Sequence, residues 1–218
     1  MKFSVDALLF DSDETLVSSL ASVSRCWTRW AIAHGLTLAD VLAVRPHGRP
    51  AAAIVADLLP SERVAAALAE LQQAEVDDAV AGGVVPVPGS RELLASLPSH
   101  RWAVVTSGTR RVANARLSAA GLDVAYLVAV DDVTRHKPHP EPFLTAARLL
   151  GVDPARCIAF EDAPAGLEAA RAAGMTTVAL TTTHAADDLA SGADAVIPDL
   201  SAVTVRRTDT GIDVTVAV

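Results

Sequence analysis

The chain has 218 residues, of which 51% are apolar and 20% are charged, and its formal net charge is -8. This length fits one α/β domain with a smaller inserted module and excludes a large multidomain assembly. The apolar content excludes a disordered chain. Because the acidic balance is not offset by any Lys/Arg cluster, we expect no nucleic-acid partner.

The sequence also lacks the marks of export and membrane insertion. No apolar stretch approaches the roughly 20 residues that span a bilayer, and the N-terminus does not have the pattern of a signal peptide. Cys26 and Cys157 lie far apart in apolar segments, which favours two buried, reduced thiols over a disulfide or a zinc site. We therefore expect a cytoplasmic protein with no membrane partner, either a monomer or a homodimer.

The first predicted element is a short apolar strand over residues 5–10, which ends directly before Asp11. The pattern then changes to alanine-rich helices, expected at residues 20–33, 50–58 and 61–80, the last opened by a Ser61 cap. Because no strand pattern interrupts them, residues 17–86 are predicted to form an inserted helical cap domain.

After Pro86, strand and helix patterns alternate to near the end of the chain. We expect strands at 102–105, 126–130, 157–160, 176–180 and 195–197, and helices at 90–97, 110–120, 141–150 and 166–173. This alternation predicts an α/β fold with a doubly wound, Rossmann-like parallel sheet, so the core domain would consist of residues 1–16 and 87–218. Residues 203–218 alternate like a β-hairpin that could pair with a sheet edge.

Two acids follow the first predicted strand. Asp11 and Asp13 are separated by one residue, and we expect both to reach the crevice at the carboxyl edge of the sheet, where open α/β sheets bind ligands. A carboxylate nucleophile suits phosphoryl transfer, because an acyl phosphate is reactive enough to be hydrolysed in a second step. The second acid would protonate the leaving alkoxide and then activate water.

Polar residues also follow the later strands. Thr106, Ser107 and Gly108 precede a helix, where a hydroxyl and free backbone N–H groups can hold phosphate oxygens. Lys137 is one of only two lysines in the chain, and its compact ammonium suits a clamp between nucleophile and phosphate.

A second acid pair, Glu161 and Asp162, ends another predicted strand. Together with Asp11 these residues would supply the hard oxygen ligands that Mg²⁺ requires. Such an ion would shield the anionic phosphate from the anionic nucleophile.

Four motifs carry a resemblance to a known family. They are DSDET (11–15), VVTSGT (104–109), KPHPEPF (137–143) and FEDAPAG (160–166). In this order they resemble the haloacid-dehalogenase superfamily of phosphohydrolases. Within this superfamily, the motif sequences are most similar to those of the glycerol-phosphate and 2-deoxyglucose-6-phosphate phosphatases. In these enzymes a helical cap directly follows the first motif.

The resemblance implies roles for the residues that match the motifs. Asp11 would be the nucleophile and a Mg²⁺ ligand, and Asp13 the general acid/base whose backbone carbonyl also binds the metal. Thr106 and Lys137 would hold phosphate, Asp162 would bind Mg²⁺, and Glu161 would act directly or through metal-bound water. The HGRP segment implies substrate contacts from His47, Gly48 and Arg49, with Arg25, Arg29 and Arg45 as further candidates.

Three positions depart from the family pattern. Glu14 and His136 stand where glycine is usual, and Ser18 stands where aspartate is usual. Because glycine eases the tight backbone path behind the acid pair and Glu14 adds a negative charge there, we expect lowered activity.

The leading interpretation is a Mg²⁺-dependent phosphatase acting on a small sugar or polyol phosphate. A phosphosugar mutase of the same fold and a catalytically weakened phosphate-binding relative remain alternatives. A receiver domain is disfavoured because it is shorter, has adjacent acids and lacks a helical insertion. A dehalogenase would not need Asp13, and a phosphonatase needs a cap lysine, which residues 17–86 do not contain.

Overall fold

The computed structural model describes residues 1–44 and 49–217. Its centre is a six-stranded parallel sheet in the order β6-β5-β2-β7-β8-β9. The strands are β2 (Ala7–Phe10), β5 (Trp102–Val105), β6 (Leu127–Val128), β7 (Cys157–Glu161), β8 (Thr176–Leu180) and β9 (Ala195–Ile197). The predicted doubly wound α/β fold is confirmed.

Helices cover both faces of this sheet. On β2, Leu8 and Phe10 point into one core cluster and Ala7 and Leu9 into the other, as the alternation of a buried strand requires. The first cluster is closed by α5 and α6 and the second by α7 and α8. These helices are α5 (Ser90–Ser96), α6 (Arg110–Ala119), α7 (Glu141–Leu150) and α8 (Pro164–Ala172).

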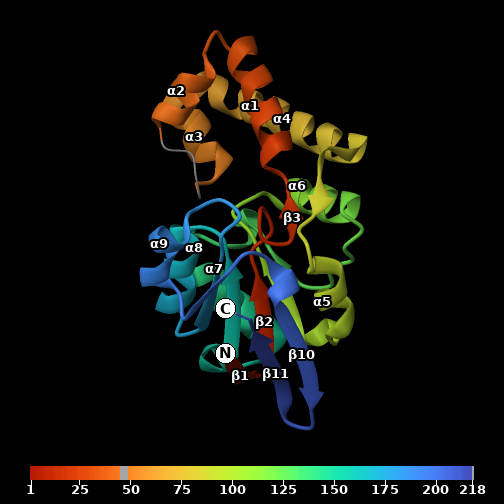
Figure 1. Ribbon diagram of the computed structural model, residues 1–218. Helices are drawn as coiled ribbons and strands as arrows, with labels where there is room; N and C mark the ends of the chain where they lie inside the picture. Colours follow the sequence, from red (N-terminus) through yellow and green to blue (C-terminus); the bar gives the residue numbers. More distant parts are fainter. Residues whose placement is uncertain (45–48, 218) are drawn as a thin grey trace.

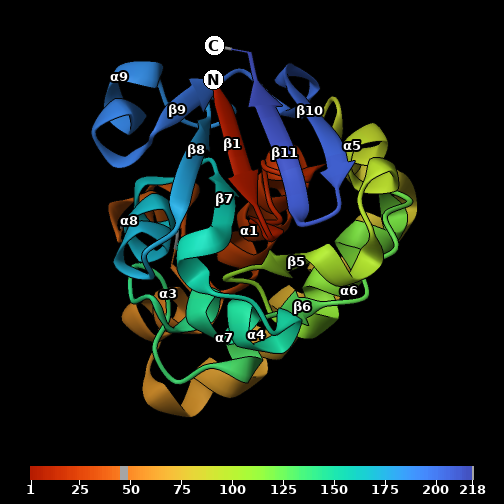
Figure 2. The ribbon, with the colours of Figure 1, turned by 90° about the horizontal axis from the view of Figure 1, so that it is seen from below.

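A second, antiparallel sheet packs against the first cluster and contains the first and the last strand of the chain (Figure 2). Its order is β1-β11-β10, with β1 (Lys2–Val5), β10 (Val203–Thr208) and β11 (Gly211–Val216). The predicted hairpin is confirmed, and β1 is the edge with which it pairs. The strand predicted over residues 5–10 is present as β2, but it begins at Ala7, and Val5 belongs to β1. The extended backbone is interrupted at Asp6, whose carboxylate pairs with Arg156 at 2.8 Å. The strands on either side of Asp6, β1 and β2, join different sheets.

Four helices form a layer above the carboxyl edge of the parallel sheet (Figure 1). They are α1 (Leu20–Ala33), α2 (Leu38–Ala43), α3 (Ala51–Leu58) and α4 (Ser61–Asp78). This layer has its own apolar core, in which Trp27 and Trp30 pack edge to face.

Some expected boundaries in this layer differ from the structure. Helix α2 was not predicted, because its six residues are too few to show a helical period. Pro60, not Ser61, occupies the N-cap of α4, and the Ser61 hydroxyl contacts Glu62 instead. Helix α4 ends at Asp78 and continues as a π-helical turn over Ala79–Gly83.

A two-stranded ribbon stands where the helical layer leaves and rejoins the sheet. In it, β3 (Val17–Ser18) pairs antiparallel with β4 (Val85–Pro86). The sequence predicted no strand there, because two residues are too few to show alternation. The ribbon brings the two connections of the helical segment to one place.

Several smaller features complete the description. Strand β6 is shorter than predicted and passes into a 3₁₀ turn at Val130–Asp132, and the short helix α9 (Ala186–Leu189) was not predicted. Both cysteines are buried free thiols, as expected. Within the described ranges, none of the helices is long and apolar enough to cross a membrane.

Candidate active site

The site is built on the adjacent strands β2, β5 and β7, whose carboxyl ends meet at one edge. Phe10 lies opposite Phe160 in the pairing of β2 with β7, and their rings stack with centroids 5.0 Å apart. The Asp11 N–H donates to the Phe160 carbonyl at 2.9 Å. This packing fixes Asp11 and Glu161, the residues that follow the two phenylalanines, side by side.

Lys137 reaches this edge from the loop before α7. Its Nζ donates to Asp11 Oδ1 at 2.6 Å, to Glu161 Oε1 at 2.5 Å and to the Val105 carbonyl at 2.8 Å. The Phe143 ring centroid lies 5.2 Å from Nζ. The ammonium is therefore buried with all three of its protons donated.

Asp11, Glu161 and Asp162 form a buried cluster in which one carboxylate oxygen from each lies within 4.8 Å of the others. Burial raises the pKa of Asp11 to about 7, although Lys137 opposes this shift. Burial likewise raises the pKa of Glu161 to about 8 and that of Asp162 to about 7. Three acids around a single ammonium leave an excess of negative charge, which a bound cation would compensate.

Other residues hold this acid cluster in place. The Thr183 hydroxyl contacts Asp162 Oδ2 at 2.5 Å and the Asp162 backbone carbonyl at 2.9 Å. Gly166, in the first turns of α8, makes room for Glu161, because a Cβ there would lie 2.0 Å from the Glu161 Cδ. The glycine of the FEDAPAG motif thus has a steric reason.

Asp13 is held differently from Asp11. Its Oδ1 accepts from the Ser19 hydroxyl at 2.6 Å and from the Arg116 guanidinium at 2.9 Å. Arg116 also donates to Glu75 Oε1 at 3.0 Å. Its guanidinium on α6 therefore joins Asp13 to α4 of the helical layer.

Arg116 and Glu75 were not among the predicted site residues, although the sequence carries a signal for them. On α6 the buried residues are Val112, Ala113, Arg116 and Leu117, and on α4 they are Ala67, Leu71 and Glu75. A single charge thus falls on the apolar stripe of each helix. Because buried charges must be paired, this pattern could have suggested that the two charges meet.

The phosphate-site candidates lie between β5 and α6. The Thr106 N–H donates to the Val128 carbonyl at 2.9 Å, and its hydroxyl accepts from the Gly108 N–H at 3.0 Å. The expectation that the backbone N–H groups here are free is therefore wrong for Gly108. Thr109 occupies the N-cap of α6, and Ser107 is partly exposed between these residues.

Glu14 adopts a positive φ of 60°, the conformation for which glycine is the usual residue. Its Oε1 accepts from the Ser19 and Leu20 N–H groups, both at 2.6 Å. The carboxylate therefore accepts hydrogen bonds from the N-cap residue of α1 and from its first residue. Of the other two departures, Ser18 pairs with Val85 in the ribbon, and His136 accepts a backbone hydrogen bond from His139.

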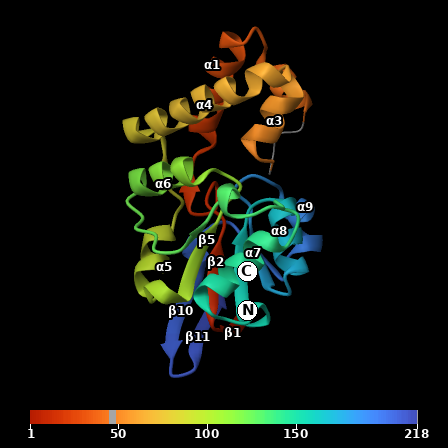
Figure 3. The ribbon, with the colours of Figure 1, turned by 180° about the vertical axis from the view of Figure 1, so that it is seen from behind.

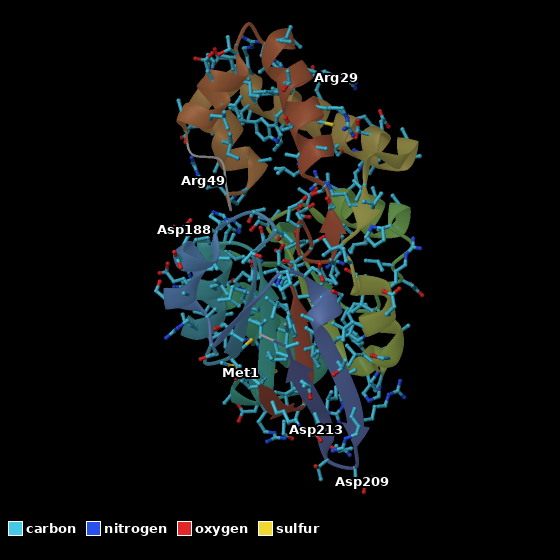
Figure 4. All side chains as sticks on the ribbon, viewed as in Figure 1. Met1, Arg29, Arg49, Asp188, Asp209 and Asp213 are labelled. Atoms are coloured by element: carbon cyan, nitrogen blue, oxygen red, sulfur yellow. The ribbon has the colours of Figure 1, made fainter. Side chains whose placement is uncertain are left out.

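Of the cap candidates, only Arg25, Arg29 and Arg49 lie within the described residues. His47, Gly48 and Arg45 lie outside the described residues. Arg49 donates to the Val44 carbonyl and to Asp57, both at 2.7 Å, and Arg25 pairs with Asp78 at 2.7 Å. Figure 4 shows Arg49 on the side of the helical layer that faces the sheet and Arg29 on its outer side.

Comparisons with known proteins agree with this fold. The haloacid dehalogenase-like hydrolase profile matches residues 5–174. Hexitol phosphatase A from Escherichia coli is 37% identical, with coverage of 93% of this chain and 95% of the relative. Validoxylamine A 7'-phosphate phosphatase from Streptomyces hygroscopicus is 42% identical, covering 89% and 94%. The crystal structure of a hydrolase from Pseudomonas syringae has a TM-score of 0.79 and 26% identity, covering 90% and 94%.

Proposed function

Because the chain belongs to the haloacid dehalogenase-like hydrolases and is a phosphoric monoester hydrolase, we propose that it hydrolyses a small sugar or polyol phosphate with Mg²⁺ through an aspartyl-phosphate intermediate. The observation that carries this proposal is the arrangement around Asp11. A buried lysine and two further carboxylates surround Asp11 at the carboxyl ends of adjacent strands.

We assign Asp11 as the nucleophile. Lys137 occupies Oδ1, and no described residue donates a hydrogen bond to Oδ2, so this oxygen is the one that would attack phosphorus. The bond to the alkoxide leaving group would break as the bond to Oδ2 forms. Splitting hydrolysis into two displacements in this way lowers the barrier of each.

We assign Asp13 as the general acid and then the general base. Ser19 and Arg116 hold its Oδ1, and no hydrogen bond from the described part of the chain reaches Oδ2. That oxygen would give its proton to the leaving alkoxide and later remove one from the attacking water. Proton transfer of this kind typically contributes about 10²–10⁴-fold in rate.

The donor set of the acid cluster fits Mg²⁺, which prefers hard oxygen ligands. Asp11 and Asp162 would bind the ion, Glu161 directly or through water, and Asp13 through its backbone carbonyl. Burial is the largest cause of the raised pKa values of the three carboxyl groups, and repulsion between neighbouring carboxylates adds to it. When bound, the ion supplies charge neutralisation for the phosphate oxygens.

We assign phosphate binding to the Thr106–Gly108 segment and Lys137. The Thr106 hydroxyl accepts from Gly108 and so keeps its own proton for a phosphate oxygen. Ser107 offers a second hydroxyl, and Lys137 places its positive charge beside the nucleophile.

We further propose that residues 17–86 form a cap domain over a core of residues 1–16 and 87–218. The β3–β4 ribbon and the separate apolar core of the helices support this division. Such a cap would exclude bulk water from the site. His47, Gly48 and Arg49 remain our candidates for substrate contact. The two named phosphatases, one for hexitol phosphates by its name, support a sugar or polyol phosphate as substrate.

A panel of sugar, polyol and aryl phosphates, assayed with Mg²⁺ and with EDTA, tests the proposal. We expect Mg²⁺-dependent phosphate release, abolished by EDTA, and a loss of at least about 10³-fold in Asp11→Asn. Full activity in EDTA or in this variant would overturn the mechanism. Conversion of one sugar-phosphate isomer into another without phosphate release would instead identify a mutase, and binding without turnover a weakened relative.

A further inference from the structure

Arg116 is a buried cation shared by two carboxylates from different parts of the molecule. Its side chain is 5% exposed, those of Asp13 and Glu75 are 29% and 8% exposed, and the two ion pairs measure 2.9 Å and 3.0 Å. Figure 3 shows α4, which carries Glu75, lying over α6, which carries Arg116. A desolvated charge with two partners interacts much more strongly than an exposed one.

The position of Arg116 is set by the core of the α/β layers. On either side of it along α6, Ala113 and Leu117 are buried in the core cluster that includes Phe10. Its guanidinium therefore presents a fixed donor to Asp13 Oδ1, while the Ser19 hydroxyl donates to the same oxygen. Two donors on one oxygen fix the rotation of the carboxylate and leave Oδ2 as the oxygen that exchanges protons.

Glu75 makes this arrangement depend on α4. Because Arg116 carries one positive charge for two carboxylates, any shift of α4 changes the field at Asp13 as well as the contact at Glu75. We propose that Arg116 is a positioning residue that orients Asp13 for proton transfer and links that orientation, through Glu75, to the seating of α4. This inference rests on the role of Asp13 in the proposed function.

The chain offers a matched control at the next turn of the interface. Arg111, also on α6, donates to the Gln73 side chain of α4. It joins the same two helices but contacts neither Asp13 nor Glu75 among the described residues. Arg111→Met therefore removes one contact between α6 and α4 and leaves the Asp13–Arg116–Glu75 contacts, which hold α4 in place, intact.

The test uses two substrates that differ in their need for a proton. A nitrophenolate leaves without protonation, whereas an alkoxide needs an acid. Release of the alcohol in the first turnover is measured by rapid quench with p-nitrophenyl phosphate and with a hexitol phosphate or whichever alkyl phosphate wild type turns over fastest. This first step precedes water activation, in which Asp13 would act for both substrates.

We expect Arg116→Met to slow the alkyl substrate by about 10²-fold and the aryl substrate by less than about threefold. Arg116→Lys should recover part of the loss, because a lysine keeps the charge but not the fork of the guanidinium. Glu75→Gln should give a smaller loss of the same selectivity, about tenfold. Arg111→Met should stay within about twofold of wild type with both substrates.

Equal losses with the two substrates in Arg116→Met, or the same selective loss in Arg111→Met, would overturn the inference. If Arg116→Met does not fold, Glu75→Gln decides, and an absence of alkyl-selective loss there has the same consequence. Wild type that releases no phosphate with Mg²⁺ would remove the proposed function and this inference together. Active wild type with unselective variants removes only the inference.

Discussion

The carboxyl edge of the sheet and the contact between α6 and α4 have the same arrangement of charges but different surroundings. In each, one buried cation lies between two carboxylates, Lys137 between Asp11 and Glu161, and Arg116 between Asp13 and Glu75. Around Lys137, all partners come from the α/β layers, whose strands are locked by pairing and aromatic stacking. Around Arg116, one partner comes from the helical layer.

Because their surroundings differ, we expect the two clusters to have different roles in the reaction. Every group around Lys137 belongs to the α/β layers, so the geometry of this cluster does not depend on the position of the helical layer. That suits a nucleophile and a metal site, which need fixed geometry. The cluster around Arg116 spans two layers connected by a short ribbon, so it suits a step that should follow the position of the helices.

The largest stability effect is expected from Lys137→Met. It would leave Asp11, Glu161 and Asp162 as a buried group without a cation, which typically costs about 3–5 kcal/mol in the free energy of unfolding. Urea unfolding in EDTA measures this. The control is Arg25→Met, whose pair with Asp78 is partly exposed and should cost under about 1 kcal/mol. A cost for Lys137→Met as small as that of the control would contradict a central role for this ammonium.

A smaller loss is expected when the room for Glu161 is removed. The Cβ added by Gly166→Ala would overlap the Glu161 carboxyl group, and such overpacking costs about 1–3 kcal/mol. Titration calorimetry should also show weaker Mg²⁺ binding. Gly192→Ala is the control, because its Cβ would meet Leu167 at an ordinary 3.4 Å. Unchanged Mg²⁺ affinity in Gly166→Ala would argue against Glu161 as a ligand or a support of one.

The acid cluster should also make the metal-free protein sensitive to pH. Burial raises the pKa of Asp11 and Asp162 to about 7 and that of Glu161 to about 8, so the folded state binds more protons than the unfolded state above about pH 4. Stability should therefore fall as pH rises from about 4 to about 8. The raised pKa of Lys137 acts only at higher pH, where its stabilising effect would be lost.

Thermal unfolding in EDTA between pH 5 and pH 8 measures this dependence. We expect Tm to fall across the range, and added Mg²⁺ to raise Tm more at pH 8 than at pH 5, because the ligands are then ionised. A flat profile, or an equal effect of Mg²⁺ at both pH values, would show that the cluster carries no excess charge.

The smallest effect concerns Glu14, which links the two layers at their junction. Glu14→Ala removes the cap on α1 and keeps a side chain at positive φ, so we expect a loss of about 1 kcal/mol. Glu14→Gly also removes the cap but relieves the backbone, and the two effects should nearly cancel. Chemical unfolding of both variants compares them. A larger loss in the glycine variant than in the alanine variant would contradict this assignment.

Much of the sheet could be predicted because its strands are buried on both faces and bounded by polar turns. The strands Trp102–Val105, Thr176–Leu180 and Ala195–Ile197 agree to the residue, as does the helix Glu141–Leu150. The break at Asp6 was missed because residues on both sides of it are buried, and only the partner strands distinguish the two sheets.

In the candidate site, too, local motifs predicted some residues, whereas others depend on how distant elements pack. Asp11, Glu161 and Asp162 lie in short motifs at strand ends, which parallel strands bring together, and Lys137 lies in a short motif in the loop before α7. The pairing of Arg116 with Glu75 joins residues 41 positions apart, and local patterns do not fix how two helices pack. The contact of the Glu14 carboxylate with the start of α1 was likewise not predicted, because local patterns do not show where α1 lies, and the expected effect of Glu14 on activity stays a prediction.

The most direct test of the central claim is to trap the covalent intermediate on Asp11. Wild type turning over its best substrate with Mg²⁺ is quenched and treated with borohydride, which reduces an acyl phosphate to an alcohol, and the peptides are analysed by mass spectrometry. We expect the reduced residue at position 11, and only when both substrate and Mg²⁺ are present. Reduction at another residue, or none at all under conditions of rapid turnover, would contradict Asp11 as the nucleophile.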